Sequence, residues 1–193
     1  MNRNLKTMDN AKTLKKINIF TLTKVALMTA VICVLGPLSI NIPVSPVPIT
    51  LGIVGILLSV YVLGCKLGTL SIAIYLLLGA FGVPVFSNFS GGFAKIAGPT
   101  GGYLVGFIFL ALIAGIFVEK FSEKKIVQFF GILLAILVCY ALGTVWLKVS
   151  AHMTFTAALA AGTLPYIPFD IAKAIFCVLL GSKLRTLLNK KTQ

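Results

Sequence analysis

The sequence predicts an all-α integral membrane protein of six transmembrane helices, and three observations carry this prediction. Of the 193 residues, 59% are hydrophobic and 11% are charged, and the mean hydropathy is +1.06. Soluble domains carry about 25% charged residues, so the composition argues against a soluble fold. Apolar runs of about 20 residues, the length that a spanning helix needs, follow one another along the chain. Most Lys and Arg residues lie between these runs.

Six apolar runs are expected to span the membrane as helices, and they leave no room for a soluble catalytic or nucleotide-binding domain. The runs cover residues 19–38, 48–64, 67–82, 101–118, 127–149 and 168–186. We therefore expect a membrane domain at 19–186, between a basic amino-terminal tail at 1–18 and a basic carboxy-terminal tail at 187–193. No small-residue cleavage site follows the first run, which predicts a retained helix rather than a signal peptide.

The positions of the basic residues predict that both termini are cytoplasmic and that the protein resides in the cell membrane. With the amino terminus inside, thirteen of the seventeen Lys and Arg residues face inward, and only Lys95 falls in an outer loop. Basic residues at the inner surface also meet anionic lipids of the bilayer. The net charge of +13 therefore needs no nucleic acid as a partner, because nucleic-acid binders gather their basic residues on a soluble face.

Three long loops face outward in this topology, at Ser39–Val47, Gly82–Thr100 and Ser150–Ile167. All eight prolines of the chain lie within these loops or at their edges. Stiff loops gathered at one membrane face are a suitable place for a small-molecule site, since irregular backbone is tolerated where it lines a cavity.

Asp170 and Lys173 are the strongest candidates for ligand binding. They are three residues apart at the outer end of the last run, so a helix places them on one face. A charge in a spanning segment costs about 2.5–3.5 kcal/mol, which marks it as a functional candidate. The other acids, Asp9, Glu119 and Glu123, are expected inside, which leaves Asp170 as the carboxylate for an outward-facing site. A self-satisfied ion pair near the membrane interface is the alternative.

The glycine-rich segment 82–107 is the second candidate. Gly98, Gly102 and Gly106 recur every four residues and are expected to form a smooth face for close helix packing. Packing alone explains less well why polar residues accompany them, among which Asn88 and Tyr103 are candidates for the site.

Residues 41–50, NIPVSPVPIT, form the third candidate because they are too apolar for a solvated loop and too rich in proline for a helix. They are expected either to cover an apolar ligand as a lid, with the Thr50 hydroxyl at the end, or to form a buried structural loop. A fourth candidate is the pair Ala26 and Ala30, whose small side chains let another helix approach closely. That helix belongs either to this chain or to a separate membrane subunit.

No metal site, cofactor or catalytic centre is expected. The four cysteines are widely spaced, His152 is the only histidine, and neither a phosphate-binding loop nor a hydrolase motif is present. His152 is expected in a loop. A lipid-modifying membrane enzyme would need a nucleophile or a metal cluster at one membrane face.

These segments resemble the biotin-binding S-components of energy-coupling factor (ECF) transporters, the BioY family. The resemblance rests on NIPVSPVPIT, on GVPVFSNFSGG followed by GPTGGYLVGF, on PYIPFDIAKA and on the alanines of ALMTA. It implies a six-helix protein that binds biotin from outside and associates with a transmembrane subunit and two ATPase subunits.

By this resemblance, Asp170, Lys173, Tyr103 and Asn88 bind the ligand, and Ala26 and Ala30 contact the transmembrane subunit. One departure is Gly52, where many relatives carry glutamine, which weakens any polar role for the start of the second helix. An S-component for another vitamin and a membrane scaffold without transport activity are the alternative functions.

Overall fold

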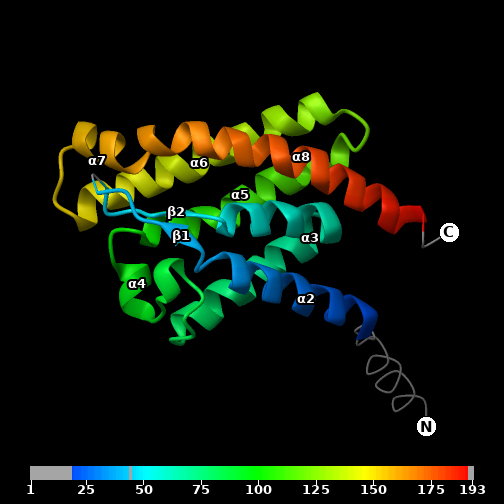
Figure 1. Ribbon diagram of the computed structural model, residues 1–193, viewed down its shortest axis with the longest axis horizontal. Coiled ribbons are helices and arrows are strands. Elements are labelled where there is room, and N and C mark those ends of the chain that lie inside the picture. The colour runs from blue at the N-terminus through cyan, green and yellow to red at the C-terminus, as the bar shows by residue number, and fades with distance from the viewer. Residues whose placement is uncertain (1–18, 44, 191–193) are drawn as a thin grey trace, which may run out of the picture.

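The computed structural model describes residues 19–43 and 45–190, and helices dominate it (Figure 1). The predicted tail at 1–18 lies outside the described residues. The long helices are α2 (Ile19–Leu35), α3 (Gly52–Ala80), α5 (Gly101–Lys120), α6 (Lys125–Ser150) and α8 (Ile167–Lys190). The shorter elements are the helices α4 (Phe93–Ala97) and α7 (Phe155–Gly162), the 3₁₀ turns η1 (Ser87–Phe89) and η2 (Leu164–Tyr166), and the strands β1 (Ser39–Ile40) and β2 (Ile49–Thr50).

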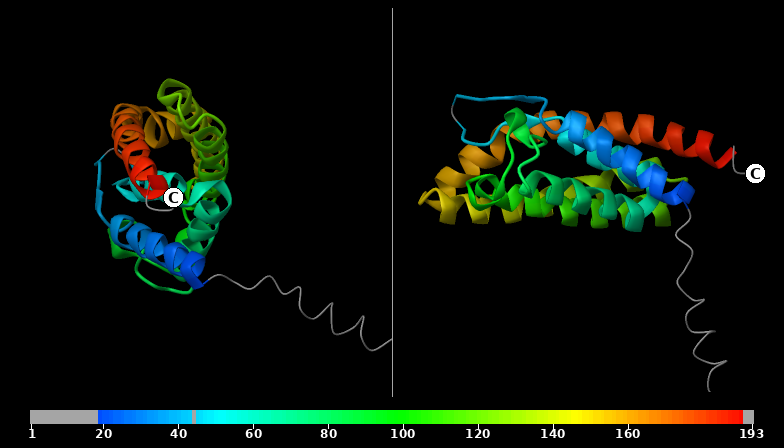
Figure 2. Two further views of the ribbon diagram at one scale, coloured as in Figure 1. Left: turned by 90° about the vertical axis from the view of Figure 1, so that its right-hand side faces the viewer. Right: turned by 90° about the horizontal axis from the view of Figure 1, so that it is seen from below.

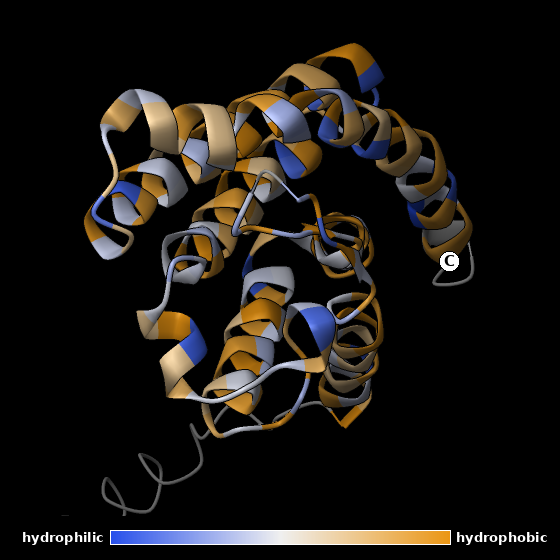
Figure 3. Ribbon diagram, turned by 60° about the vertical axis from the view of Figure 1, so that its left-hand side comes forward, coloured by the Kyte–Doolittle hydropathy of each residue, from blue (hydrophilic) through white to orange (hydrophobic). Residues whose placement is uncertain are grey.

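The long helices have the apolar outer faces of a membrane protein. Within the described residues, four helical segments are long and apolar enough to cross a membrane: Gly52–Ala80, Gly101–Lys120, Lys125–Ser150 and Phe155–Leu188. The helix α2 is apolar but shorter, at 17 residues. Leu27, Leu137 and Phe176 are each more than half exposed, and apolar residues prevail along the long helices (Figure 3). Helices also satisfy their own backbone hydrogen bonds, as a bilayer requires.

Helix α3 contains both the second and the third predicted span, because the chain reverses direction inside it. Gly64 has φ 82° and ψ −177°, outside the helical region. A Cβ atom on Gly68 would lie 3.0 Å from the Cα of Val60, whereas eight residues of straight helix extend about 12 Å. The two halves of α3 therefore pack side by side. The predicted boundary between the second and third spans coincides with this reversal, and the total of six spans remains a prediction.

Glu119, in the last turn of α5, stabilises the reversal. Its Oε1 atom accepts a hydrogen bond of 2.7 Å from the backbone N–H of Cys65, at the start of the second half of α3. A carboxylate at a helix amino terminus is favourable because it meets unpaired N–H groups and the positive end of the helix dipole. A Cβ atom on Gly64 would lie 2.3 Å from Glu119 Oε1. Only glycine fits both the backbone conformation and this close approach.

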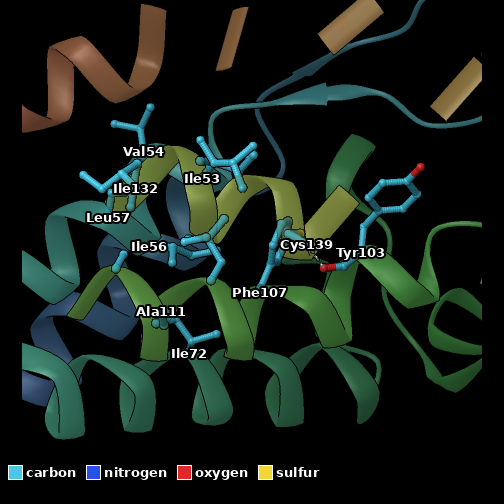
Figure 4. Packing of buried hydrophobic residues seen from close by; sticks show 14 of the residues in the cluster. Ile53, Val54, Ile56, Leu57, Ile72, Tyr103, Phe107, Ala111, Ile132 and Cys139 are labelled. Carbon is cyan, nitrogen blue, oxygen red and sulfur yellow. Dashed lines mark hydrogen bonds between the residues drawn. The ribbon is translucent and has the colours of Figure 1, made fainter. Parts of the chain in front are cut away.

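Helix α5 lies between α3 and α6, and small residues let it pack closely on α6. A Cβ atom on Gly102 would lie 2.2 Å from Trp146 Cβ, and one on Gly106 would lie 2.8 Å from Cys139 Sγ. Gly98 was expected on the same helix face but precedes α5, which begins at Gly101. The side chains of Ile56 and Ile72 from α3 also lie beside α5 (Figure 4).

The three loops predicted to face outward meet at one end of the bundle. The described chain begins and ends at the opposite end (Figures 1 and 2). The first loop is more regular than the sequence indicated: β1 and β2 form an antiparallel hairpin in which Ser39 pairs with Thr50 and Ile40 with Ile49. At the other end, α8 extends to Lys190 and so includes the first residues of the predicted carboxy-terminal tail.

Replacing Gly64 by alanine is expected to destabilise the protein. The variant must relax a backbone conformation that costs about 1–3 kcal/mol for a residue with a side chain, and it must displace Glu119. A melting temperature several degrees below that of the unmodified protein is expected in detergent, since about 2–4 °C corresponds to 1 kcal/mol in a chain of this length.

Gly82→Ala is the matched control for this prediction. Gly82 also has a positive φ, 98°, but a Cβ atom there would meet nothing within 4 Å. Equal melting temperatures for the two alanine variants would contradict the role assigned to Glu119.

Candidate functional site

A cavity of about 60 Å³ lies at the loop end of the bundle. A buried water needs about 10–15 Å³ by this measure, so several waters fit. Its walls come from α3, α5, α6 and α8 and from the β1–β2 hairpin. Apolar side chains predominate: Val47, Pro48, Ile49, Ile53, Leu104 and Phe107. The polar side chains are Thr50, Ser87, Lys95, Thr100, Tyr103, Tyr140, Tyr166, Asp170 and Lys173. Four of the five residues predicted to bind ligand therefore line one cavity, and Asn88 does not.

Asp170 and Lys173 form a buried ion pair in the cavity wall. Lys173 Nζ lies 2.8 Å from Asp170 Oδ1, and their side chains are 11% and 4% exposed. The hydroxyl of Tyr140 donates a hydrogen bond of 2.6 Å to Asp170 Oδ2. The i,i+3 ion pair that was the alternative interpretation does form, but it lies in the cavity wall. A buried charge of this kind needs such partners, and each carboxylate oxygen has one.

Tyr140 is a cavity residue that the sequence analysis missed. It lies in the predicted span 127–149, where a buried tyrosine hydroxyl usually finds a hydrogen-bond partner. This tendency indicates from the sequence that Tyr140 has a partner, but it does not identify the residue that accepts the hydrogen bond.

Tyr103 connects α5 to α7 while it lines the cavity. Its hydroxyl donates a hydrogen bond of 2.8 Å to the backbone carbonyl of Gly162, at the end of α7. Its ring packs against α6 at Gly143, where a Cβ atom would lie 2.2 Å from the ring. Figure 4 shows Tyr103 beside Cys139 of α6, whose Sγ donates to the Tyr103 carbonyl. Tyr103 therefore holds α5, α6 and α7 together at the loop end of the bundle.

The β1–β2 hairpin covers one side of the cavity, a position that fits either of its two expected roles, a lid or a buried structural loop. Val47, Pro48 and Ile49 line it directly. The hydroxyl of Tyr166 binds the loop between the strands, through Ser45 Oγ at 2.6 Å and the carbonyl of Val47.

Thr50 lines the cavity at the end of the hairpin. Its hydroxyl accepts a hydrogen bond of 3.2 Å from the N–H of Gly52. Since a hydroxyl has one hydrogen to donate in addition to its acceptor sites, Thr50 can still donate into the cavity.

Asn88 lies outside the cavity and binds the hairpin instead. Its side-chain Nδ2 donates to Asn41 Oδ1 at 2.8 Å, and its Oδ1 accepts from Ser39 Oγ at 2.8 Å. Its φ of 59° is in the left-handed region, which asparagine tolerates better than most residues. Asn88 therefore joins the loop after α3 to the loop after α2. His152 is exposed in the turn after α6 and does not line the cavity.

Ala26 and Ala30 are both exposed on α2. Their neighbours Val25 and Thr29 are buried and face the rest of the bundle. Packing within this chain, the first of the two expected explanations for the alanine pair, is therefore wrong. A smooth patch on the outer surface of α2 remains for contact with another membrane helix.

Within residues 19–43 and 45–190, no group of three or more His, Cys, Asp or Glu side chains could hold a metal ion. The cysteines are free, and Cys65, Cys139 and Cys177 are buried. The buried ones act as small apolar packing residues.

An apolar helix bundle that encloses a small cavity with a buried ion pair in its wall is the organisation of a membrane protein that binds a small molecule. The chain belongs to the BioY family, whose model matches residues 6–190.

Relatives and a solved structure agree with this assignment. The chain is 42% identical to the biotin transporter BioY of Thermotoga maritima over 166 residues, which cover 86% of this chain and 96% of the relative. It is also 42% identical to the probable biotin transporter BioY of Pyrococcus horikoshii over 161 residues, covering 83% and 93% of the two chains. The crystal structure of the S-component for biotin from an ECF-type ABC transporter matches with a TM-score of 0.81 and 32% identity, over 96% of this chain and 95% of that one.

Replacing Tyr103 by phenylalanine is expected to lower the stability of the loop end. The buried carbonyl of Gly162 loses its donor, which costs about 1–3 kcal/mol, while the ring still packs on α6. A lower melting temperature and faster amide exchange in α7 are expected.

Tyr75→Phe is the control for this variant, because Tyr75 is buried and lines the same cavity, while its hydroxyl makes no hydrogen bond within the described residues. If both variants have the same melting temperature as the unmodified protein, the hydrogen bond from Tyr103 to Gly162 does not stabilise the structure.

Proposed function

We propose that this protein is the biotin-binding membrane subunit, or S-component, of an ECF-type ABC transporter that takes up biotin. The observation that carries the proposal is the Asp170–Lys173 pair in the wall of a largely apolar cavity. Support comes also from the BioY family match and from relatives that are named biotin transporters.

The cavity offers the groups that biotin requires. The ureido ring of biotin presents N–H donors and a carbonyl acceptor, which are complementary to a carboxylate and an ammonium group. Asp170 can accept from an N–H, and Lys173 can donate to the ureido oxygen. The sulfur ring and the aliphatic tail are apolar and suit the side chains of Val47, Ile53 and Phe107. Polar contacts from Asp170 and Lys173 and apolar contacts from the other lining residues suit binding of the ligand without a chemical reaction.

Transport requires energy, and we infer that nucleotide hydrolysis by this chain does not supply it. Its sequence contains no phosphate-binding loop motif. We infer that a transmembrane subunit and two ATPase subunits supply the energy. The exposed patch of Ala26 and Ala30 on α2 is the proposed contact with the transmembrane subunit.

The cavity is proposed to open to the outside of the cell membrane, with both termini in the cytoplasm. The loop end with the cavity and the end with both described termini are opposite ends of the bundle (Figure 1). Basic residues at the latter end, among them Lys66, Lys120 and Lys183, suit the cytoplasmic surface.

Asp170→Asn and Lys173→Ala are each expected to weaken biotin binding by more than about tenfold, because each variant leaves a buried polar partner unpaired at about 1–3 kcal/mol. Equilibrium binding of radiolabelled biotin to the purified protein in detergent measures this. Glu123→Gln, an exposed acid at the other end, is the control and should bind like the unmodified protein.

Unchanged biotin affinity in both cavity variants would contradict the proposal that Asp170 and Lys173 bind the ligand. A thermal-shift panel of other vitamins separates the functions: stabilisation by a different vitamin would identify an S-component for that ligand, and no saturable binding would favour a scaffold.

Ala30→Phe is expected to reduce co-purification with the transmembrane subunit severalfold while biotin binding stays unchanged, because a large ring prevents close helix approach. Ala141→Phe, an exposed alanine on α6, is the matched control. Pull-down of tagged complexes from membranes gives the readout, and equal recovery of all three complexes would exclude this face of α2 as the contact.

A further inference from the structure

The positive and negative charges of the side chains that line the cavity do not cancel. They are Asp170, Lys173 and Lys95, which sum to one positive charge. Asp170 and Lys173 neutralise each other at 2.8 Å. In the part of the chain that the structure describes, the ammonium group of Lys95 makes neither an ion pair nor a hydrogen bond. Lys95 is therefore the one lining residue with an uncompensated charge among those described.

Lys95 is carried by a short helix that is anchored on both sides. Helix α4 starts after Gly92, whose N–H donates to the carbonyl of Gly79 at 2.7 Å. It ends before Gly98, whose carbonyl accepts a hydrogen bond of 2.9 Å from the indole N–H of Trp146. The backbone that presents Lys95 to the cavity is thus fixed to α3 and to α6. Lys95 is half-buried, so its charge is only partly screened by solvent.

Lys173 is a poor partner for an anionic group of the ligand. Its ammonium group contacts Asp170 Oδ1, so an incoming carboxylate would lie close to a second carboxylate. The two negative charges would repel each other, and the low local dielectric constant would strengthen this repulsion. Tyr140 already donates to the other oxygen of Asp170, so both carboxylate oxygens have a partner. The ion pair therefore suits a neutral polar group, and Lys95 suits an anion.

We propose that Lys95 forms a carboxylate subsite of the cavity, which selects ligands with a free carboxylate over neutral esters or amides. The proposal rests on the proposed biotin-binding function and assigns the two ends of the ligand. The neutral ureido ring meets Asp170 and Lys173, and the carboxylate of the valerate tail meets Lys95. A ligand with one negative charge then brings the net charge of the cavity to zero.

The test compares biotin with biotinamide, in which a neutral carboxamide replaces the carboxylate. The proteins are the unmodified chain, Lys95→Met, Lys95→Arg and Lys148→Met, a control that removes an exposed lysine outside the cavity. Calorimetry of each purified protein with each ligand gives the affinities. Lys95→Met should lose about 10- to 100-fold in affinity for biotin, the range for a hydrogen bond to a charged group, and little for biotinamide. Lys95→Arg should retain most of the preference for biotin.

The outcomes separate this proposal from the function on which it rests. Equal loss for both ligands in Lys95→Met, or no loss for either, would overturn the carboxylate subsite while leaving biotin binding intact. Failure of the unmodified protein to bind either ligand would overturn both proposals. Lys148→Met should match the unmodified protein, and a comparable loss there would assign the effect to net charge rather than to the cavity. Melting temperatures of the four proteins verify that the variants fold.

Discussion

A carboxylate inside an apolar helix bundle must have partners, and the loop end of this protein depends on how Asp170 obtains them. An unpaired ion there would cost several kcal/mol. Lys173 comes from the same helix, but Tyr140 comes from α6, so the charge ties α6 to α8. Asp170 and Tyr140 also line a separate apolar groove of about 180 Å³ between these helices. The same contact therefore separates that groove from the cavity.

Acids are scarce in this chain, and the described ones divide clearly between roles. Glu119 binds the start of the second half of α3 and fixes a chain reversal, whereas Glu123 is exposed. Asp170 lines the cavity. Two of the three described acids, Glu119 and Asp170, thus accept hydrogen bonds from other helices of the bundle. Among the described bases, Lys173 and Lys95 line the cavity.

Hydropathy predicted the helices well, because the bilayer requires apolar runs of fixed length. Helical spacing predicted that Asp170 and Lys173 share a face, since that relation is local. The partnership with Tyr140 was not predictable, because it joins residues 30 apart through the packing of two helices. Asn88 shows the same limit: its segment was correctly placed beside the loop end, but its left-handed backbone turns the side chain toward Ser39 and Asn41.

The two sides of the cavity are held by contacts of different strength. On the helix side, close packing of α5 on α6 and the hydrogen bond from Tyr140 of α6 to the buried Asp170 of α8 resist separation, and a hydrogen bond to a charged group contributes about 1.5–3 kcal/mol. On the hairpin side, hydrogen bonds from Tyr166 and Asn88 join the β1–β2 segment to its neighbours. Such bonds contribute about 0.5–1.5 kcal/mol each, and the exposed ones can be replaced by water. Displacing the hairpin is therefore the less costly way to open the cavity, and it leaves the contacts of Asp170, Lys173 and Tyr103 in place.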